Sequence, residues 1–352
     1  MKHRIFNISL FTLYITISTA LMIWQGIGIS PDRYAFVLLL GSLLVKKTRS
    51  FILDWLPFLF ILISYDFLRS FADKLNTQVH YVELIGADKT IFGFIPTIEL
   101  QKIFFHPGFL SWYDFLATIL YFLHFALPLS FGFILWLKNK NQFKEFTTGI
   151  LLLSYAGWLT YLAFPAAPPW LAGERGFLQG VTKIMDLTLK NFPERLNLPT
   201  IYHNFNPNPV AAMPSMHAAY PFLVFLFALK FFKLKALLFS PYVLAVWISI
   251  IYLGEHYAID VVVGAFYAAV FYFVSANLHN WQLQKRLSFV YNLQTMAKKA
   301  NRIDLGLECS VCKSRNYVTS KNTVNTKEKL SLKKFCRKCR KVQIHNEFTK
   351  LK

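Results

Sequence analysis

Eight stretches of this chain are almost continuously apolar, and most approach the length of one bilayer crossing. They cover residues 5–28, 33–46, 51–72, 112–138, 145–164, 216–233, 236–254 and 258–279. A transmembrane helix needs roughly 20 apolar residues, so the second and sixth stretches fit least well. The first stretch could be a signal peptide, but it is long and lacks a convincing small-residue cleavage site. The pattern predicts an all-α polytopic membrane protein with about eight transmembrane helices.

Composition agrees with this pattern and separates the chain into two parts. Hydrophobic residues make up 55% of the 352 residues and charged residues 16%, whereas about a quarter of a soluble chain would be charged. Residues 279–352 hold 18 of the 38 lysines and arginines but only 4 of the 18 acidic residues, so they carry +14 of the net charge of +20. All four cysteines also lie in this tail. The tail is therefore expected to be a separate polar domain.

The basic residues between the apolar stretches predict the orientation of the chain. With eight spans, five clusters of lysine and arginine fall on one side of the membrane, which should be the cytoplasm. These clusters are Lys2 and Arg4; Lys46, Lys47 and Arg49; Lys138, Lys140 and Lys144; Lys230, Lys233 and Lys235; and Lys285 and Arg286. Both termini would then be cytoplasmic, and residues 73–111, 165–215 and 254–257 would lie outside.

Two short segments on the outer side carry ionisable residues, which at membrane depth usually serve a function. His256 and Asp260 are four positions apart, so on a helix they share a face, and the carboxylate would orient the imidazole as a nucleophile. His217 reaches the same level from another span and could protonate a leaving alcohol oxygen. Ser215 and the amides beside it could hold phosphate oxygens. The alternative is that both histidines lie at the membrane interface and form hydrogen bonds with water or lipid headgroups. The presence of two such histidines on the same side argues against this alternative.

The motifs around these residues resemble the type 2 phosphatidic acid phosphatase superfamily. The segment from Pro214 to His217 is similar to its second motif, and the pair His256 and Asp260 is similar to its third. The resemblance implies that His256 is the nucleophile, Asp260 its orienter and His217 the general acid. Further similarity, over roughly residues 50–280, is to the inositol phosphorylceramide synthase-like branch, and the matching text lies at residues 113–125, 161–170 and 252–257. This branch implies a six-helix membrane core that acts on lipids.

Two departures from the superfamily concern the groups that bind phosphate. The first motif, a lysine followed by Arg-Pro, has no counterpart, and Ile250 replaces the arginine that usually precedes the third-motif histidine by six positions. Another cation must then bind the phosphate oxygens. Arg69, at the outer end of the third stretch, is the candidate, although it could equally be a snorkelling residue or a partner for Asp66. His124 is expected to be a packed histidine more than a catalytic one.

The tail carries a separate signal for metal binding. Cys309-x-x-Cys312 and Cys336-x-x-Cys339 could close a tetrahedral four-thiolate Zn²⁺ site, although the gap between the pairs is slightly long for a zinc ribbon. Thiols stay reduced in the cytoplasm, which favours a metal over disulfides.

The text around the cysteines, at residues 315–322, 330–336 and 345–347, resembles the zinc-ribbon protein thirty-three of the bacterial large ribosomal subunit. The resemblance implies a small β module whose basic clusters contact ribosomal RNA. The fusion could be natural, a relic kept as a cytoplasmic cap, or two merged reading frames, and the sequence leaves these open.

These observations predict four regions. They are a transmembrane helix pair at 1–50, a phosphatase-like membrane core at 51–280, a basic amphipathic connector at 281–306 and a zinc-ribbon domain at 307–352. The predicted function is a lipid phosphotransferase of the inositol phosphorylceramide synthase type in a bacterial inner membrane, with its active site outside. It would use a phospholipid or sphingolipid substrate and a lipid or polyol acceptor, without a catalytic cofactor.

Two other functions remain open at this point. In a lipid phosphate phosphatase, water would take the place of the acceptor alcohol. In a membrane tether for ribosomes or RNA, the catalytic part would have decayed, and the intact His217, His256 and Asp260 argue against this.

Overall fold

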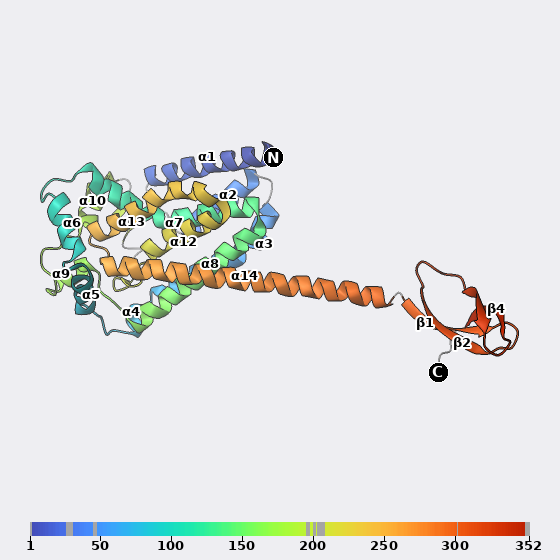
Figure 1. Cartoon of the computed structure of the whole chain (residues 1–352). Coiled ribbons are helices and arrows are strands. Elements are labelled where there is room, and N and C mark those ends of the chain that lie inside the picture. The colour runs from blue at the N-terminus through green and yellow to red at the C-terminus, as the bar shows by residue number, and fades with distance from the viewer. Residues whose placement is uncertain are drawn as a thin grey trace. The chain divides into compact units, whose positions relative to one another are not determined.

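The computed structural model describes residues 2–25, 31–44, 48–194, 198–199, 202, 208–300 and 302–348 (Figure 1). Of the sequence predictions above, Lys46, Lys47 and the last four residues of the tail lie outside this described part. The chain forms two compact units, Met1–Asn277 and Leu278–Lys352, and each is described by itself.

The first unit is helical. Its longer helices are α1 (Lys2–Trp24), α2 (Pro31–Leu44), α3 (Thr48–Arg69), α7 (Trp112–Lys138), α8 (Lys140–Ala163), α12 (Met216–Phe232), α13 (Ser240–Tyr252) and α14, which begins at Ala258 and continues to Ala300 in the second unit. Its shorter elements are α4 (Ala72–Leu75), α5 (Val82–Phe92), α6 (Pro96–Phe104), α9 (Pro169–Glu174), α10 (Ile184–Asn191) and the 3₁₀ helix η2 (Lys233–Phe239). Each of the eight apolar stretches thus coincides with a helix.

Fewer helices than eight are long and apolar enough to cross a membrane. Among the described residues, three qualify: Thr48–Arg69, Lys140–Ala163 and Ala258–Lys285. A fourth is the bent pair Trp112–His124 and Ala126–Lys138, whose halves differ in direction by 47°. Pro128 lies inside α7 and lacks the N–H that would bond the carbonyl of residue 124, which accounts for the bend. The chain is therefore a mostly helical membrane protein with three to four candidate spans.

The prediction of eight spans exceeds this finding, and three of the remaining helices, α2, α12 and α13, are short. α12 has 17 residues and α13 has 13, which at the helical rise correspond to about 26 Å and about 20 Å. The hydrocarbon core of a bilayer is about 30 Å thick.

Both faces of α3 are apolar, as expected in a lipid environment. On the inner face Trp55 is fully buried, with its ring centroid 5.1 Å from that of Phe51 and 5.0 Å from that of Phe143 on α8. On the outer face Leu53 and Phe60 are largely exposed. Since lipid tails are as apolar as these side chains, close aromatic packing holds the helices together more than exclusion from water does.

The segments predicted as external loops contain helices of their own. Residues 73–111 form most of α4 and all of α5 and α6, and residues 165–215 include α9 and α10. Figure 1 shows α5, α6, α9 and α10 gathered at one end of the helical bundle. Of these helices, α5, α6 and α9 make hydrogen bonds to the segment that joins α13 to α14 or to the residues on either side of it.

The second unit contains the small β module predicted for the tail. Its strands are β1 (Arg302–Cys309), β2 (Arg315–Asn322), β3 (Ser331–Cys336) and β4 (Lys341–Phe348), arranged in the order β2-β1-β4-β3. All neighbouring strands are antiparallel. The segment predicted as a connector is the C-terminal part of α14 followed by the start of β1.

Candidate active site

The candidate nucleophile, His256, lies in a tight turn between α13 and α14. The amides of Glu255 and His256 both donate to the carbonyl of Ile250, at 3.2 Å. Gly254 has a φ of +81°, and a Cβ at this position would lie 3.1 Å from the carbonyl oxygen of Thr182. Glycine is therefore needed here both for the left-handed backbone and for the close approach of residue 182.

Two side chains from α6 hold this turn in place. The amide nitrogen of Gln101 donates to the carbonyls of Tyr252 and Thr182, each at 2.8 Å, and the hydroxyl of Thr97 donates to the carbonyl of His256 at 3.3 Å. A lone glutamine or threonine in an amphipathic segment gives no signal of its partners, so the sequence did not point to these residues.

Asp88 supports the same turn from α5. Its carboxylate accepts hydrogen bonds from the backbone amides of Ala258 and Ile259, at 3.2 and 2.8 Å, where α14 begins. These amides have no acceptor within the helix, and a negative charge is favourable at a helix N-terminus. Burial raises the pKa of Asp88 to about 6.

The second motif is joined to α14 by backbone contact. Ser215 is the N-cap of α12, where its hydroxyl oxygen accepts from the amide of Ala218 at 3.2 Å, and its own amide donates to the carbonyl of Asp260 at 3.2 Å. A Cβ on Gly264 would lie only 2.4 Å from the carbonyl oxygen of Ser215. Ser215 is fully buried and does not line the cavity described below. Its role in phosphate binding stays a prediction.

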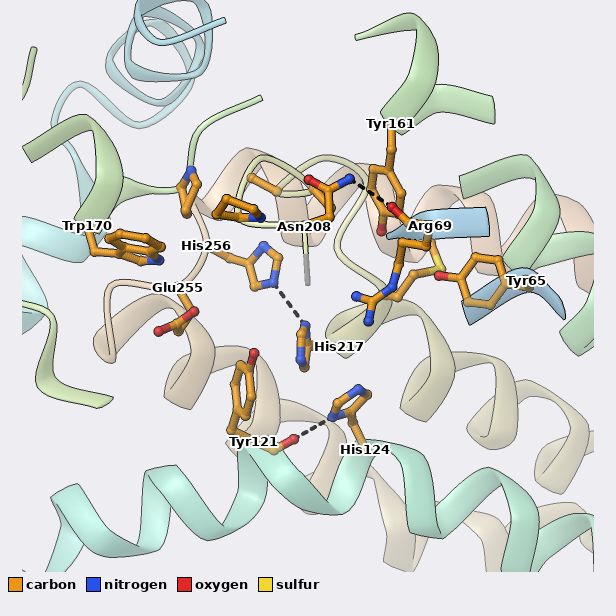
Figure 2. Close-up of a pocket in the computed structure, with 15 residues that line it drawn as sticks. Tyr65, Arg69, Tyr121, His124, Tyr161, Trp170, Asn208, His217, Glu255 and His256 are labelled. Carbon is orange, nitrogen blue, oxygen red and sulfur yellow. Dashed lines mark hydrogen bonds between the residues drawn. The ribbon is translucent and has the colours of Figure 1, made fainter. Parts of the chain in front are cut away.

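These supports bring the three predicted catalytic residues together, and Figure 2 shows two of them, His217 and His256, facing each other. His217 Nδ1 lies 3.1 Å from His256 Nε2, so one nitrogen donates and the other accepts. His256 Nδ1 lies 3.5 Å from Asp260 Oδ2, and that oxygen also accepts from the amide of Tyr257 at 2.9 Å. His256 and Asp260 are both buried. A carboxylate thus lies beside one nitrogen of the His256 imidazole, which makes no hydrogen bond within the described residues, while the other nitrogen faces a second imidazole.

A small polar cavity opens onto this row. Its volume is about 30 Å³, and it is lined by Tyr65, Arg69, Tyr121, His124, Tyr161, Pro168, Trp170, Asn208, Pro209, Ala211, Ala212, Met216, His217, Glu255 and His256. One ordered water needs roughly 10–15 Å³ of such space. In this conformation the cavity has room for water, and a lipid headgroup requires the lining side chains to move apart.

Arg69, the cation predicted to bind phosphate, lines this cavity. It is 9% exposed and is the sole lysine or arginine among the described residues that line the cavity. Its guanidinium also donates to Asp66 Oδ1 at 3.1 Å, so Arg69 is a partner for Asp66, and its role in phosphate binding stays a prediction. Asn208 donates to the Arg69 carbonyl at 3.2 Å, which ties the end of α3 to the loop before α12.

His124 and Tyr121 pack directly on His217 from α7. The ring centroid of Tyr121 is 4.1 Å from that of His217, and that of His124 is 3.9 Å away. His124 Nδ1 lies 2.5 Å from the carbonyl of Tyr121, one turn earlier. His124 is thus a packed histidine in contact with a candidate catalytic ring.

Glu255 and Trp170 also line the cavity, and the sequence analysis assigned them no role. Glu255 is 4% exposed, and both of its carboxylate oxygens lie 2.9 Å from the Tyr202 hydroxyl that donates to them. Burial raises the pKa of Glu255 to about 7. Its position directly before His256 was the available signal in the sequence, because titratable groups cluster at functional sites.

The four cysteines of the tail meet in the second unit. All four thiols are free, and the four sulfur atoms lie within 4.8 Å of one another, with Cys312 Sγ 3.4 Å from Cys336 Sγ. Zinc–sulfur bonds of about 2.3 Å in a tetrahedron place the sulfurs about 3.8 Å apart. The donor set therefore fits a metal ion that prefers four thiolates.

Comparison with known proteins now identifies the larger unit. The family profile described as "PAP2 superfamily" matches residues 88–274, more than half of the chain. The chain belongs to the PAP2 superfamily. Phosphoinositol dihydroceramide synthase of Bacteroides thetaiotaomicron is 30% identical over 226 residues, which cover 62% of this chain and 74% of that protein. The chain is therefore an enzyme of this superfamily, a lipid phosphotransferase or phosphatase.

The tail matches a different family. The profile described as "Ribosomal protein L33" covers residues 303–349. Large ribosomal subunit protein bL33A of Myxococcus xanthus is 55% identical over 49 residues, which are 14% of this chain and 91% of that protein. The bL33 protein of Campylobacter hominis is 51% identical over 52 residues, which are 15% and 93%. No solved structure matches the chain significantly.

The extent of the PAP2 match bears on the two phosphate-binding groups of the superfamily that this chain lacks. The match includes the turn with His256 and the N-terminus of α12, but it begins at residue 88. Arg69, at the end of α3, therefore lies outside the matched part of this PAP2 protein, yet its side chain lines the same cavity as His217 and His256.

Proposed function

We propose that this PAP2 protein is a phosphotransferase that moves a phosphoalcohol group from a phospholipid to a second alcohol through a covalent intermediate on His256. The observation that carries the proposal is the row of His217, His256 and Asp260 beside a buried cavity that also holds Arg69. The named relative, a phosphoinositol dihydroceramide synthase, supports a transferase over other members of the superfamily.

In the first step, Nε2 of His256 attacks phosphorus, and the bond from phosphorus to the leaving lipid alcohol breaks. His217 carries a proton on Nδ1 and gives it to the leaving oxygen. Asp260, 3.5 Å from Nδ1 of His256, holds the ring and stabilises the positive charge that develops on it. Since the two imidazole nitrogens lie 3.1 Å apart, the reacting phosphorus must separate them when substrate enters.

In the second step, His217 takes the proton of the acceptor alcohol, whose oxygen attacks phosphorus. The phosphorus–nitrogen bond breaks and its electron pair returns to His256. Arg69 would stabilise the negative charge on the phosphoryl oxygens through both steps, the task of the two missing basic groups of the superfamily.

Hydrolysis is the second candidate, because a cavity of about 30 Å³ has room for water. Incubation of the purified protein with a phospholipid labelled in its phosphoryl group separates the two functions. With a lipid alcohol present, the transferase yields a new labelled phospholipid. A phosphatase instead yields a water-soluble labelled product whether or not an acceptor is added.

We extend the proposal to the membrane arrangement: eight spans, cytoplasmic termini and an active site outside a bacterial inner membrane. The basic clusters between the apolar stretches support this orientation. In sealed cells, Arg175→Cys should react with an impermeant thiol reagent and Lys140→Cys should not. The reverse labelling pattern would place the active site in the cytoplasm.

For the tail we propose a zinc ion bound by Cys309, Cys312, Cys336 and Cys339, and affinity for ribosomal RNA. The compact thiol cluster and the similarity to the L33 family support this. The RNA affinity should fall steeply as salt rises, because the basic residues would release counterions from phosphates. Salt-independent binding, or none, would leave the tail without this role.

A further inference from the structure

The four cysteines of the C-terminal unit are not equivalent, because one sulfur accepts a hydrogen bond from a side chain. The amide nitrogen of Asn316, on β2, donates to Cys336 Sγ at 3.2 Å. The backbone amide of Cys339 donates to the same sulfur at 3.5 Å. Within the described residues, Asn316 is the one side-chain N–H donor to a cysteine sulfur. Cys336 is therefore held by a group outside the two Cys-x-x-Cys pairs.

His345 fixes the direction of the Asn316 amide. It is fully buried on β4, and its Nδ1 lies 3.0 Å from the carbonyl oxygen of Gln343. Because a carbonyl can only accept, Nδ1 carries the proton and Nε2 of the neutral ring is an acceptor. Nε2 lies 2.9 Å from the Asn316 amide nitrogen. That nitrogen therefore donates one hydrogen to His345 and the other to Cys336.

The oxygen of the Asn316 side chain has a partner of its own. The hydroxyl of Ser314 donates to Oδ1 at 3.1 Å. If the amide group were turned over, its oxygen would face the sulfur and a ring nitrogen, and both of these are acceptors. The network therefore allows one orientation, and the N–H that faces Cys336 is positioned before a metal binds.

The network joins strands that are not neighbours in the sheet. In the order β2-β1-β4-β3, Asn316 lies on one edge strand and Cys336 ends the other. The hydroxyl of Tyr317, next to Asn316, donates to the carbonyl of Phe335, next to Cys336, at 2.7 Å. Two bonds at successive positions thus connect β2 to the end of β3. This pair of bonds restricts how far the amide can move from the sulfur.

Four thiolates around a divalent cation leave an excess of negative charge, which N–H donors to sulfur reduce. Resting on the zinc site proposed above, we propose that Asn316 is a positioning residue for the metal and that His345 directs it. Asn316 holds the Cys336 thiolate by its hydrogen bond, and the pair strengthens the retention of zinc without binding the ion. Such outer groups typically change metal affinity by about 10- to 100-fold.

The test measures the zinc affinity of the purified full-length protein by competition with a chromophoric chelator. Asn316→Ala removes the donor and should weaken zinc binding by about 10- to 100-fold. Asn322→Ala is the matched control, because it removes the same side chain from β2, where Oδ1 accepts from the amide of Val324 at 2.9 Å. The control should stay within about twofold of wild type, as expected for a site without shared partners.

Cobalt substitution separates a hydrogen bond to sulfur from a general structural role. The bond lowers the energy of the sulfur lone pair, so its loss in Asn316→Ala should shift the thiolate-to-cobalt charge-transfer band to longer wavelength. The visible bands of tetrahedral cobalt should remain, because all four thiolates remain. A purely structural contribution of Asn316 would leave the charge-transfer band of the folded variant unshifted.

Two substitutions at His345 test the direction of the bond. In His345→Gln the side-chain oxygen can replace Nε2 as the acceptor, whereas His345→Leu removes the acceptor. The leucine variant should bind zinc a few-fold more weakly than the glutamine variant. Added to Asn316→Ala, His345→Leu should weaken binding little further, because both act through one bond. If Asn316→Ala does not fold, the two His345 variants decide the matter.

Three results would overturn the role of Asn316. They are an unchanged zinc affinity in Asn316→Ala, an unshifted charge-transfer band in that variant, and equal affinities of the two His345 variants. The proposed zinc site fails separately, when the wild-type protein takes up no zinc or when Cys336→Ser binds zinc as tightly as wild type.

Discussion

The two units of this protein build their candidate sites in opposite ways. In the C-terminal unit, the four sulfur atoms come from two Cys-x-x-Cys pairs at the ends of strands, and the sheet needs only to bring two short segments together. In the membrane unit, the row of His217, His256 and Asp260 depends on groups from α5 and α6 that belong to no recognisable motif. A site built from two short motifs can be predicted from the spacing of residues in the sequence. A site built from several separate segments can be predicted from the sequence only in part.

The largest effect is expected when the four-cysteine site of the C-terminal unit is disrupted. In the full chain, Cys336→Ser should lower bound zinc from one ion to none, measured by elemental mass spectrometry, and expose the tail to proteolysis. A structural zinc site contributes on the order of 10 kcal/mol, and a unit this small has little core of its own. Ser331→Ala on the exposed part of β3 is the matched control.

Diacylglycerol release should stay within about twofold of wild type in Cys336→Ser, because the cysteines and the candidate catalytic residues belong to separate compact units. Removal of the residues after 285 should likewise spare turnover. Loss of catalysis in a truncated protein that is still folded and inserted would show that the two units depend on each other.

The distributed site should fail when its nucleophile is removed. His256→Ala is expected to lower turnover by at least about 10³-fold, while Asp260→Asn should retain some activity because the imidazole remains without its orienter. His217→Ala should be most harmful for lipids with poor leaving alcohols. His106→Ala, at an exposed histidine in the loop between α6 and α7, is the control. Wild-type turnover in His256→Ala would refute the mechanism.

A smaller effect is expected from substitution of a residue that positions the site but takes no part in the reaction. In Gly264→Ala, the new Cβ would lie 2.4 Å from the Ser215 carbonyl oxygen, so α14 and the second motif must separate. Overpacking of this kind costs about 1–3 kcal/mol, and displacement of His217 from His256 should lower kcat by up to about 100-fold.

Gly86→Ala is the matched control, because a Cβ at position 86 in α5 has no atom within 4 Å. It should leave activity unchanged and stabilise the helix by up to about 1 kcal/mol. Equal behaviour of the two variants would mean that the motifs are not held together by this contact.

The smallest expected effect is on pH dependence. Burial raises the pKa of Glu255 to about 7, and Lys183, Tyr202, His256 and Asp186 are the charged or titratable groups that act on it. Below pH 7 the protonated carboxyl accepts fewer hydrogen bonds, so the KM for phosphatidylinositol should rise a few-fold as pH falls from 8 to 6. Glu255→Gln should flatten this dependence. A profile that the variant does not change would assign the titration to another group.

The sign of the stability effect follows from the same shift. Between the unfolded pKa of 4.5 and the folded pKa of about 7, the folded state binds more protons at Glu255 than the unfolded state does. The contribution of Glu255 to stability is therefore largest below pH 4.5 and is lost as pH rises to 7. Thermal unfolding of wild type and Glu255→Gln at both ends of this window measures it.

The sequence by itself determined those features of the protein that follow from local patterns along the chain. Continuous apolar stretches place the helices, since a helix in lipid satisfies its own backbone and needs only apolar side chains. The spacing of His256 and Asp260 by one helical turn and the two Cys-x-x-Cys pairs name the reactive side chains, because those distances are set by bonds along the chain.

Only the tertiary structure decided which distant residues meet. It brought His217 of α12 within 3.1 Å of His256, and it placed Asp88 and Gln101 on the turn that holds the nucleophile. It also set Glu255 and Trp170 opposite Arg69 in one cavity. Contacts between residues tens of positions apart depend on how whole helices pack, and no periodicity or spacing along a single helix contains that information.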